Sequence, residues 1–364
     1  MSINTINARP VHHAYTQIDV RVEKAERAVW VCLQPEGRPC MTPRLLDDLS
    51  AAQRVIHGLA KAGCDAQDPE RPLYQVLTSA TPGVFCLGGD LAHFLTLMER
   101  GDRATLSSYA VRCIDVLHRS ATAYDLPFTT IALVQGQALG GGFEAALSNS
   151  VLVAEEGASF GFPETLFGMF PGMGALSLLS RRVTPGLAKR MVSSGRMYSG
   201  RELYDMGVVD VLARDGEGER VVHDYIAERR NRESGFHALE RAAERIHPLS
   251  YDELVNVAGL WVDTAMTLSM RNRRLMGYLV AAQEKRWPRP TAPRSGPERK
   301  RASTTGLFLD WHNEKAKAGA HMTDSQTSTD TDAGLAFEPL VSRCRLEVHN
   351  DLLGNTVFWE GAPF

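Results

Sequence analysis

Two glutamates and a run of three glycines are the residues of this 364-residue chain whose types and spacing best suit acid–base chemistry. The glycines are Gly140 to Gly142; Glu144 follows closely, and Glu164 lies further on in a Phe-Pro-Glu turn. Backbone N–H groups at a glycine-rich helix start point outward and can stabilise a carbonyl oxygen that gains negative charge. Two carboxylates beside that carbonyl can move protons at its α and β carbons.

The glycine run also has an ordinary explanation. Three consecutive glycines most often form a tight turn, and Glu144 could be an acid that complements a helix dipole. However, Glu144 lies inside the apolar run from Phe143 to Leu147. A carboxylate is unfavourable to bury there without a partner or a purpose. This context favours a functional site.

A second glycine turn, Cys86-Leu87-Gly88-Gly89-Asp90, has the same character. It closes an apolar strand and opens a helix, because Asp90 is a good N-cap and apolar residues follow at helical spacing. Its N–H groups could reach the second lone pair of the same carbonyl oxygen. Taken alone, a glycine turn capped by aspartate remains the better interpretation.

The elements that must position these residues alternate between strands and helices. A strand from Pro127 to Val134 is predicted to deliver the triple glycine, with a short buried helix after it. Val151 to Ala154 is then a second strand, parallel to the first if the helix crosses over. Upstream, the pattern predicts a β-hairpin over 17–33, a helix that begins at Thr42-Pro43, and a buried strand over 74–79. Together they indicate an α/β layered fold.

Five regions follow from composition along the chain. Apolar faces at helical spacing predict helices throughout the stretch after residue 215. A basic, proline-rich stretch begins after Trp287 and passes into a polar, low-complexity stretch, which we expect to be disordered. The predicted regions are a flexible arm (1–14), an α/β core (15–215), a helical region (216–288), a linker (289–334) and a short appended segment of unknown role (335–364).

Overall composition excludes several classes of protein. The formal net charge of −3 gives no general reason to expect nucleic-acid binding. No apolar run approaches a membrane span, and the first residues lack the core of a signal peptide, so we expect a cytoplasmic protein without membrane attachment. The six cysteines form no C-x-x-C pair, and the eleven histidines show no metal-binding spacing. We therefore predict no metal.

The chain resembles the crotonase (enoyl-CoA hydratase/isomerase) superfamily over roughly residues 15 to 288. The matching pieces, in order and spacing, are VFCLGGDL (84–91), ALGGGFE (138–144) and FGFPE through FPGMG (160–174). Within the superfamily it looks most similar to the diffusible signal factor synthases, which make cis-2-unsaturated fatty acid signals. The phrases that carry this narrower resemblance are LVQGQALGGGFEAALS, VAEEG, LFGMFPGMGA and LWVDTAM.

The resemblance implies a fold and a set of roles. The fold is a crotonase (ClpP-like) β-β-α spiral core with a helical C-terminal trimerisation region. Gly89 and Gly141 take the positions whose N–H groups form the oxyanion hole, with Gly88 as the nearest competitor for the first donor. Glu164 would take the α-proton and Glu144 would protonate the leaving hydroxyl, although the roles could be exchanged. The implied pocket residues are Leu139, Gly140, Trp261 and Leu279; ordinary helix packing explains Trp261 and Leu279 nearly as well.

The implied activity is that of a dual dehydratase and thioesterase. It would convert a medium-chain 3-hydroxyacyl group on acyl carrier protein, or on CoA, into a free cis-2-unsaturated fatty acid used as a quorum-sensing signal. No cofactor is implied. The implied partners are further copies of the chain, as a trimer or dimer of trimers, and a sensor or regulator of the signalling system. Two alternatives remain: a conventional enoyl-CoA hydratase, and an inactive crotonase fold that serves as a docking or RNA-binding module.

Overall fold

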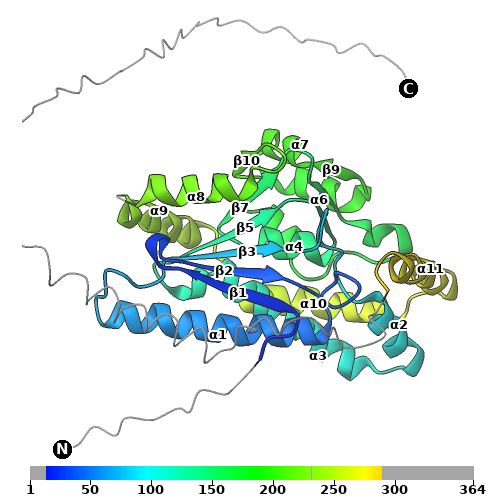
Figure 1. Cartoon of the computed structure of the whole chain (residues 1–364). Coiled ribbons are helices and arrows are strands. Elements are labelled where there is room, and N and C mark those ends of the chain that lie inside the picture. The colour runs from blue at the N-terminus through cyan, green and yellow to red at the C-terminus, as the bar shows by residue number, and fades with distance from the viewer. Residues whose placement is uncertain (1–13, 231, 289–364) are drawn as a thin grey trace, which may run out of the picture. The chain divides into compact units, whose positions relative to one another are not determined.

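The computed structural model describes residues 14–230 and 232–288 (Figure 1). The predicted linker (289–334), the appended segment (335–364) and nearly all of the N-terminal arm lie outside the described residues. Within that part of the chain, six strands form a large sheet in the order β1-β2-β3-β5-β7-β10. Their bounds are β1 Ile18–Glu23, β2 Ala28–Leu33, β3 Tyr74–Ser79, β5 Thr129–Val134, β7 Val151–Glu155 and β10 Val211–Ala213.

Strand direction in the large sheet follows from how the strands are connected. β1 and β2 are antiparallel, which confirms the predicted hairpin, and every other neighbouring pair is parallel. Parallel neighbours require crossover connections, which bury both faces of the sheet under helices. Alternate residues of β2 show this, since Val29 and Val31 join one hydrophobic cluster while Ala28 and Trp30 join the other.

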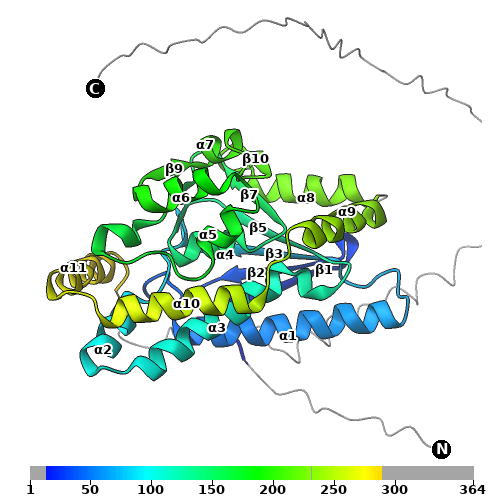
Figure 2. The same ribbon diagram turned by 180° about the vertical axis from the view of Figure 1, so that it is seen from behind.

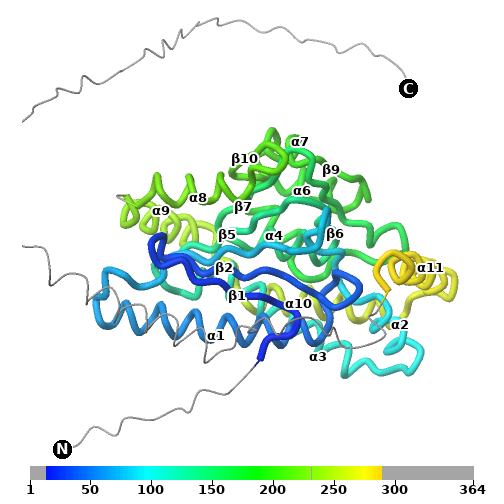
Figure 3. Tube along the Cα trace, in the orientation of Figure 1, coloured from blue at the N-terminus to red at the C-terminus, as the bar shows by residue number. Residues whose placement is uncertain are grey.

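A second, smaller sheet holds four three-residue strands in the order β4-β6-β8-β9. One prediction is corrected here: β5 does not lead directly into the triple glycine, because it ends at Val134 and β6 carries the chain to Gly140 (Figure 3). The chain can bend between the sheets because Gly136 lies against the backbone of Gly83, where a Cβ would be 2.2 Å from a carbonyl carbon. The bounds are β4 Val84–Cys86, β6 Gln137–Leu139, β8 Ser159–Gly161 and β9 Met197–Ser199.

The two sheets are linked by a repeated β-β-α unit. A strand of the large sheet is followed by one of the small sheet and then by a helical turn, in β3-β4-α2, β5-β6-α4 and β7-β8-η3. As a result, the helices that follow β4 and β6 begin next to one another, since these two strands are parallel neighbours. The helical elements are α2 Leu91–Arg100, α4 Gly141–Leu147 and the 3₁₀ turn η3 Pro163–Phe167.

Helices cover both faces of the large sheet. On one side α3 packs against both α1 and α10 (Figure 2), and their apolar residues belong to the main core. The predicted cap of the first helix is confirmed, because the Thr42 hydroxyl accepts the Leu45 N–H and Pro43 occupies the first turn. On the other side, α8 inserts Val222 and Ile226 against the sheet. The bounds are α1 Pro43–Asp65, α3 Arg103–Ala121, α8 Gly218–Arg229 and α10 Tyr251–Met266.

The remaining helices complete the chain to residue 288. The helical pattern predicted after residue 215 is confirmed. The predicted boundary between two regions at residue 215 stays a prediction. Three residues from beyond it, Leu254, Trp261 and Met276, pack into the main hydrophobic core. No helix in the described ranges is long and apolar enough to cross a membrane. The bounds are η1 Lys24–Glu26, η2 Ala123–Asp125, α5 Ala175–Leu179, α6 Pro185–Ser194, α7 Gly200–Asp205, α9 Glu233–Ile246 and α11 Met270–Arg286.

Candidate active site

The two glycine turns lie against each other. One joins β4 to α2 and contains Gly88 and Gly89; the other joins β6 to α4 and contains Gly140 and Gly141. A Cβ on Gly141 would be 3.4 Å from the Gly89 nitrogen, and a Cβ on Gly88 would be 3.1 Å from the Gly141 nitrogen. At Gly88 a Cβ would also lie 2.8 Å from the Leu139 carbonyl oxygen, and its φ is +93°, so only glycine suits this position.

The carbonyl partners of these turns fix where two N–H groups point. The Gly88 carbonyl accepts the Met41 N–H at 2.8 Å, and in a trans peptide the next N–H points the opposite way. The Gly89 N–H is therefore directed away from Met41. In the same manner the Gly140 carbonyl accepts the Glu144 N–H at 3.0 Å. The Gly141 N–H therefore points outward from the N-terminal end of α4. Neither N–H donates a hydrogen bond to any described residue.

Gly88 is distinguished from Gly89 by its contacts. The Gly88 N–H lies 3.4 Å from the Cys86 sulfur and donates to it. Gly88 also does not line the cavity described next, whereas Gly89 and Gly141 do. The geometry therefore favours Gly89 over Gly88 as the partner of Gly141 in binding one oxygen.

Both glycines, Gly89 and Gly141, and both predicted glutamates line one cavity. Its polar end is formed by Gly89, Gly141, Glu144 and Glu164, and the rest is apolar. The apolar lining comes from α2, η3, the loop before α5, α10 and α11, through Leu91, Phe94, Met98, Phe167, Met169, Gly172, Met173, Trp261, Ala265 and Met276.

Glu144 is held at the polar end by the backbone of another segment. It is 1% exposed on α4, and its Oε1 accepts the N–H groups of Met173 at 2.7 Å and Ala175 at 2.9 Å. Burial raises the pKa of Glu144 to about 7, and these two hydrogen bonds limit the rise by stabilising the charged form. Glu144 is thus a carboxylate that can gain or lose a proton near neutral pH.

Glu164 is less well supplied with partners. Its Oε2 is closed to solvent and has no hydrogen-bond partner among the described residues. Its Oε1 lies so close to Gly140 that a Cβ there would be 2.0 Å away. Burial, followed by the charge of Glu144, raises the pKa of Glu164 to about 8. Burial and the charge of Glu144 thus favour the protonated form of Glu164, whereas the two hydrogen bonds to Glu144 favour its charged form.

The predicted pocket residues differ in where the structure places them. Trp261 is buried at the cavity and packs edge-on against Phe94, with ring centroids 5.0 Å apart. Gly140 and Leu139 do not line the cavity.

Leu279 is not at the cavity, contrary to its predicted role; it is 37% exposed, and Met276 from the same helix lines the cavity. The buried face of α11 runs through Met276 and Val280, which leaves Leu279 on its flank. The sequence does not fix the rotation of this helix about its axis, so it could not show which of the helix's apolar residues faces the cavity.

Two further contributions were not predicted. The N–H groups that hold Glu144 belong to Met173 and Ala175, and backbone donors have no signature in residue type. Gly172 lies against Trp261, where a Cβ would be 2.3 Å from the indole. The glycines at 172 and 174 were the available signal, since they mark a tight backbone path.

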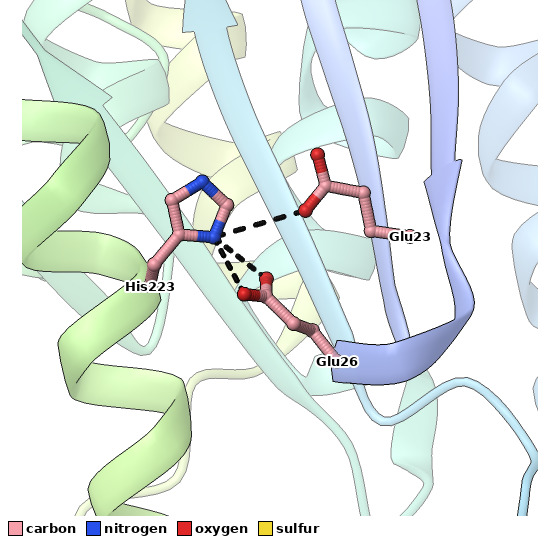
Figure 4. Close-up of side chains that lie close together, drawn as sticks. All are labelled: Glu23, Glu26 and His223. Atoms are coloured by element: carbon pink, nitrogen blue, oxygen red, sulfur yellow. Dashed lines mark hydrogen bonds and ion pairs between the residues drawn. The ribbon is translucent and has the colours of Figure 1, made fainter.

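One group of side chains elsewhere among the described residues has ligands suited to a metal ion. Glu23, Glu26 and His223 each offer one atom, all within 4.8 Å of one another (Figure 4). The His223 Nδ1 lies 2.7 Å from a Glu26 oxygen and 3.7 Å from a Glu23 oxygen. None of the three lines the cavity, and the contacts tie α8 to the β1–β2 hairpin, so the cluster is separate from the paired glutamates.

Comparison with known proteins adds a family. The family described as enoyl-CoA hydratase/isomerase matches residues 55–232. The human mitochondrial methylglutaconyl-CoA hydratase is 31% identical over 249 residues, which is 66% of this chain and 69% of that protein. The bovine mitochondrial enoyl-CoA hydratase domain-containing protein 2 is 31% identical over 278 residues, covering 73% of this chain and 89% of that protein.

Solved structures confirm the fold. An enoyl-CoA hydratase from Bacillus halodurans superimposes with a TM-score of 0.59 at 16% identity, over 72% of this chain and 100% of that one. The decarboxylase domain of CurF from Lyngbya majuscula gives 0.56 at 16% identity, over 72% and 99%. The predicted β-β-α spiral is thereby confirmed, while the trimerisation role of its helical end stays a prediction. Since hydratases and a decarboxylase share this fold, the fold alone does not fix the reaction.

Proposed function

The chain belongs to the crotonase (enoyl-CoA hydratase/isomerase) superfamily, and on that premise we propose that it dehydrates a 3-hydroxyacyl thioester and then hydrolyses the 2-enoyl thioester. One observation carries the proposal. Two carboxylates that titrate near neutral pH share a cavity with two N–H groups that have no partner among the described residues. An apolar remainder suits a fatty acyl chain.

Dehydration uses the pair of glutamates in opposite protonation states. The thioester oxygen accepts hydrogen bonds from the N–H groups of Gly89 and Gly141, which stabilises the enolate formed when the Glu164 carboxylate takes the α-proton. The bond from C3 to its hydroxyl oxygen then breaks, Glu144 donates its proton to that oxygen, and water leaves. Loss of one oxyanion donor costs about 3 kcal/mol of transition-state stabilisation.

The resting proton position bears on the direction of the reaction. Dehydration begins with the proton on Glu144 and ends with it on Glu164, which is the arrangement that the hydrogen bonds to Glu144 favour. The same arrangement is the starting point for hydration, so the first step alone is readily reversible. In the proposed reaction, hydrolysis of the enoyl thioester removes the product of dehydration and so makes the overall conversion irreversible.

Hydrolysis needs a base, a water molecule and an oxyanion site. We assign the base to Glu144, because two N–H groups stabilise its charged form. Glu144 removes a proton from water, the hydroxide oxygen bonds to the thioester carbon, and the tetrahedral intermediate is held by Gly89 and Gly141. The carbon–sulfur bond then breaks, the leaving sulfur takes the proton that Glu144 had removed from water, and the free acid is released.

The narrower identity proposed is a diffusible signal factor synthase that releases a medium-chain cis-2-unsaturated fatty acid. Two of the phrases that carry this resemblance meet at the cavity, because Gly172 of LFGMFPGMGA packs against Trp261 of LWVDTAM. This contact supports the proposal, because both phrases then lie beside the space that the acyl chain would occupy. Four further points stay predictions. They are that acyl carrier protein is the carrier, that the protein is cytoplasmic, that it needs no cofactor, and that it binds a regulatory partner.

A conventional enoyl-CoA hydratase would use the same glutamates and N–H groups, so substrate choice must separate the two functions. The purified protein is offered 3-hydroxyacyl carrier protein and trans-2-enoyl-CoA of equal chain length, and acids and thioesters are identified by mass spectrometry. Free cis-2 acid from the carrier-protein substrate is expected. Hydration of the CoA substrate without any free acid would instead support the conventional hydratase. An inactive protein would support a docking or RNA-binding module.

A further inference from the structure

We propose that Arg38 is a positioning residue that holds the Gly89 N–H toward the thioester oxygen, acting through Asp90. Arg38 lies in the loop after β2, far along the chain from the glycine turns. Neither it nor Asp90 lines the cavity, so any effect on chemistry must pass through the Gly88-Gly89 turn. The catalytic consequence rests on the proposed function, whereas the positioning itself does not.

The contact between Arg38 and Asp90 is a buried ion pair. The Arg38 Nη2 lies 2.9 Å from the Asp90 Oδ1, and the two side chains are 5% and 9% exposed. Asp90 follows Gly89 directly, and the same oxygen accepts the His93 N–H at 3.3 Å as the N-cap of α2. Arg38 therefore restrains the residue that ends the oxyanion turn and starts the next helix.

The loop that begins at Arg38 holds the turn at two further points. The Leu87 N–H donates to the Pro39 carbonyl at 2.7 Å, and the Met41 N–H donates to the Gly88 carbonyl at 2.8 Å. The second bond sets the plane of the Gly88–Gly89 peptide and hence the direction of the Gly89 N–H. Displacement of this loop would rotate that peptide, so Arg38 and Met41 act on it together.

Stability alone does not account well for this pair. A buried ion pair is often no more stabilising than apolar residues of similar volume. In addition, the Arg38 Nη1 is buried without a hydrogen-bond partner among the described residues, which is unfavourable. What the pair supplies is geometry, because a guanidinium has fixed donor directions that restrain its partner.

The chain offers a matched control in Arg27 and Glu233. This pair also joins segments that are distant in sequence, with an Nη1–Oε2 distance of 2.9 Å and side chains 20% and 18% exposed. Neither residue lines the cavity or contacts the glycine turns. Its loss should lower stability without any specific effect on Gly89.

The experiment compares Arg38→Met, Arg38→Lys, Arg38→Met/Asp90→Asn and Arg27→Met with the wild type. Hydrogen exchange is followed by mass spectrometry in peptides covering 86–92 and 140–146, which hold the two glycine turns. Arg38→Met should raise exchange in 86–92 about tenfold or more and leave 140–146 unchanged. It should lower kcat by roughly 10²-fold, the effect of a misplacement near 1 Å, with KM within about twofold. Arg38→Lys should recover part of kcat.

Several results would overturn the proposal. Unchanged exchange in 86–92, or an equal rise in Arg27→Met, would leave Arg38 with a purely structural role. Wild-type kcat in the double variant would show that Arg38 only neutralises Asp90. Should Arg38→Met fail to fold, Arg38→Lys gives the same comparison, because it keeps the charge and loses the fixed donor geometry. If the wild type turns over no thioester, the proposed function fails, and exchange in 86–92 still decides the positioning role.

Discussion

The two glutamates reach one cavity from different environments. Glu144 is anchored by two backbone N–H groups, whereas the Glu164 Oε2 has no partner among the described residues. An anchored carboxylate keeps its charge more easily than an unpartnered one, and the charge of Glu144 further disfavours ionisation of Glu164. This difference lets one group act as base while its neighbour acts as acid.

Replacing either carboxylate should abolish both reactions. Glu144→Gln and Glu164→Gln keep the size of the side chain and remove its acid–base function, so each should lower kcat by about 10²- to 10⁴-fold, the usual contribution of a general acid or base. Initial rates on the 3-hydroxyacyl thioester measure this, with circular dichroism as the control for folding. Normal turnover by either folded variant would contradict the two-glutamate scheme.

The raised pKa values also predict how stability depends on pH. In the unfolded chain both glutamates lose their protons near their ordinary pKa of 4.5, whereas in the folded protein they keep them to about pH 7 and 8. The folded state therefore binds more protons between about pH 5 and 7, and its stability falls as pH rises, by about 1 kcal/mol per group and pH unit.

Glu240, whose pKa burial raises to about 7, also contributes to this pH dependence of stability. The substitution Glu144→Gln therefore serves to separate the contribution of Glu144. The variant should show a smaller decrease in the free energy of unfolding between pH 5 and 7, measured by urea denaturation. A slope identical to that of the wild type would mean that Glu144 is charged throughout this range.

At the scale of elements, local signals predicted what local physics determines. The caps at Thr42 and Asp90, the hairpin and the strand β3 all appear as expected, because each depends on residues within a few positions. Three strands of the small sheet, β6, β8 and β9, could not be predicted, since three residues carry no periodicity and their partners are distant in sequence. Glu144 was singled out because a carboxylate in an apolar run is unusual, whereas the roles of Glu164, Gly89 and Gly141 came from the resemblance to crotonases.

The loop before α5 links the acyl end of the cavity to Glu144, and Gly172 tests this link. A Cβ on Gly172 would lie 2.3 Å from the Trp261 indole, so Gly172→Ala must displace either the indole or the loop that holds Glu144. We expect a loss of about 1–3 kcal/mol in the free energy of unfolding and at least a tenfold lower kcat.

Gly259→Ala in α10 is the matched control, because nothing lies within 4 Å of its added Cβ. It should raise the free energy of unfolding by up to about 1 kcal/mol, since alanine is the better helix former, and leave kcat unchanged. Equal kinetic effects of the two substitutions would argue against the proposed link. Urea denaturation and initial rates provide both readouts.

At the scale of the described part of the molecule, the site depends on segments spread from β2 to α11. The small sheet brings the glycine turns together, and α10 and α11 close the apolar end. These last helices also expose large apolar side chains, notably Leu260, Met270 and Tyr278. Such residues on neighbouring helices are a feature of surfaces that bind other chains.

The resemblance to crotonases implies that this surface mediates a homotrimer or a dimer of trimers. Light scattering should then give a mass of three or six copies of the 40.0 kDa chain. Tyr278→Asp should shift the mass toward the monomer, because a buried, unpaired carboxylate disfavours association. The exposed Tyr204 on α7 supplies the control, since Tyr204→Asp should leave the mass unchanged. A fully active wild-type monomer would contradict the predicted assembly.

The most direct test is a crystal structure of the protein with a non-hydrolysable 3-hydroxyacyl thioester analogue. The analogue's carbonyl oxygen should lie 2.7–3.1 Å from the nitrogens of both Gly89 and Gly141, the distances that oxyanion stabilisation requires. Glu164 should face the α carbon, and Glu144 the 3-hydroxyl group. A carbonyl oxygen bound away from either nitrogen, or a glutamate turned away from these atoms, would contradict the account.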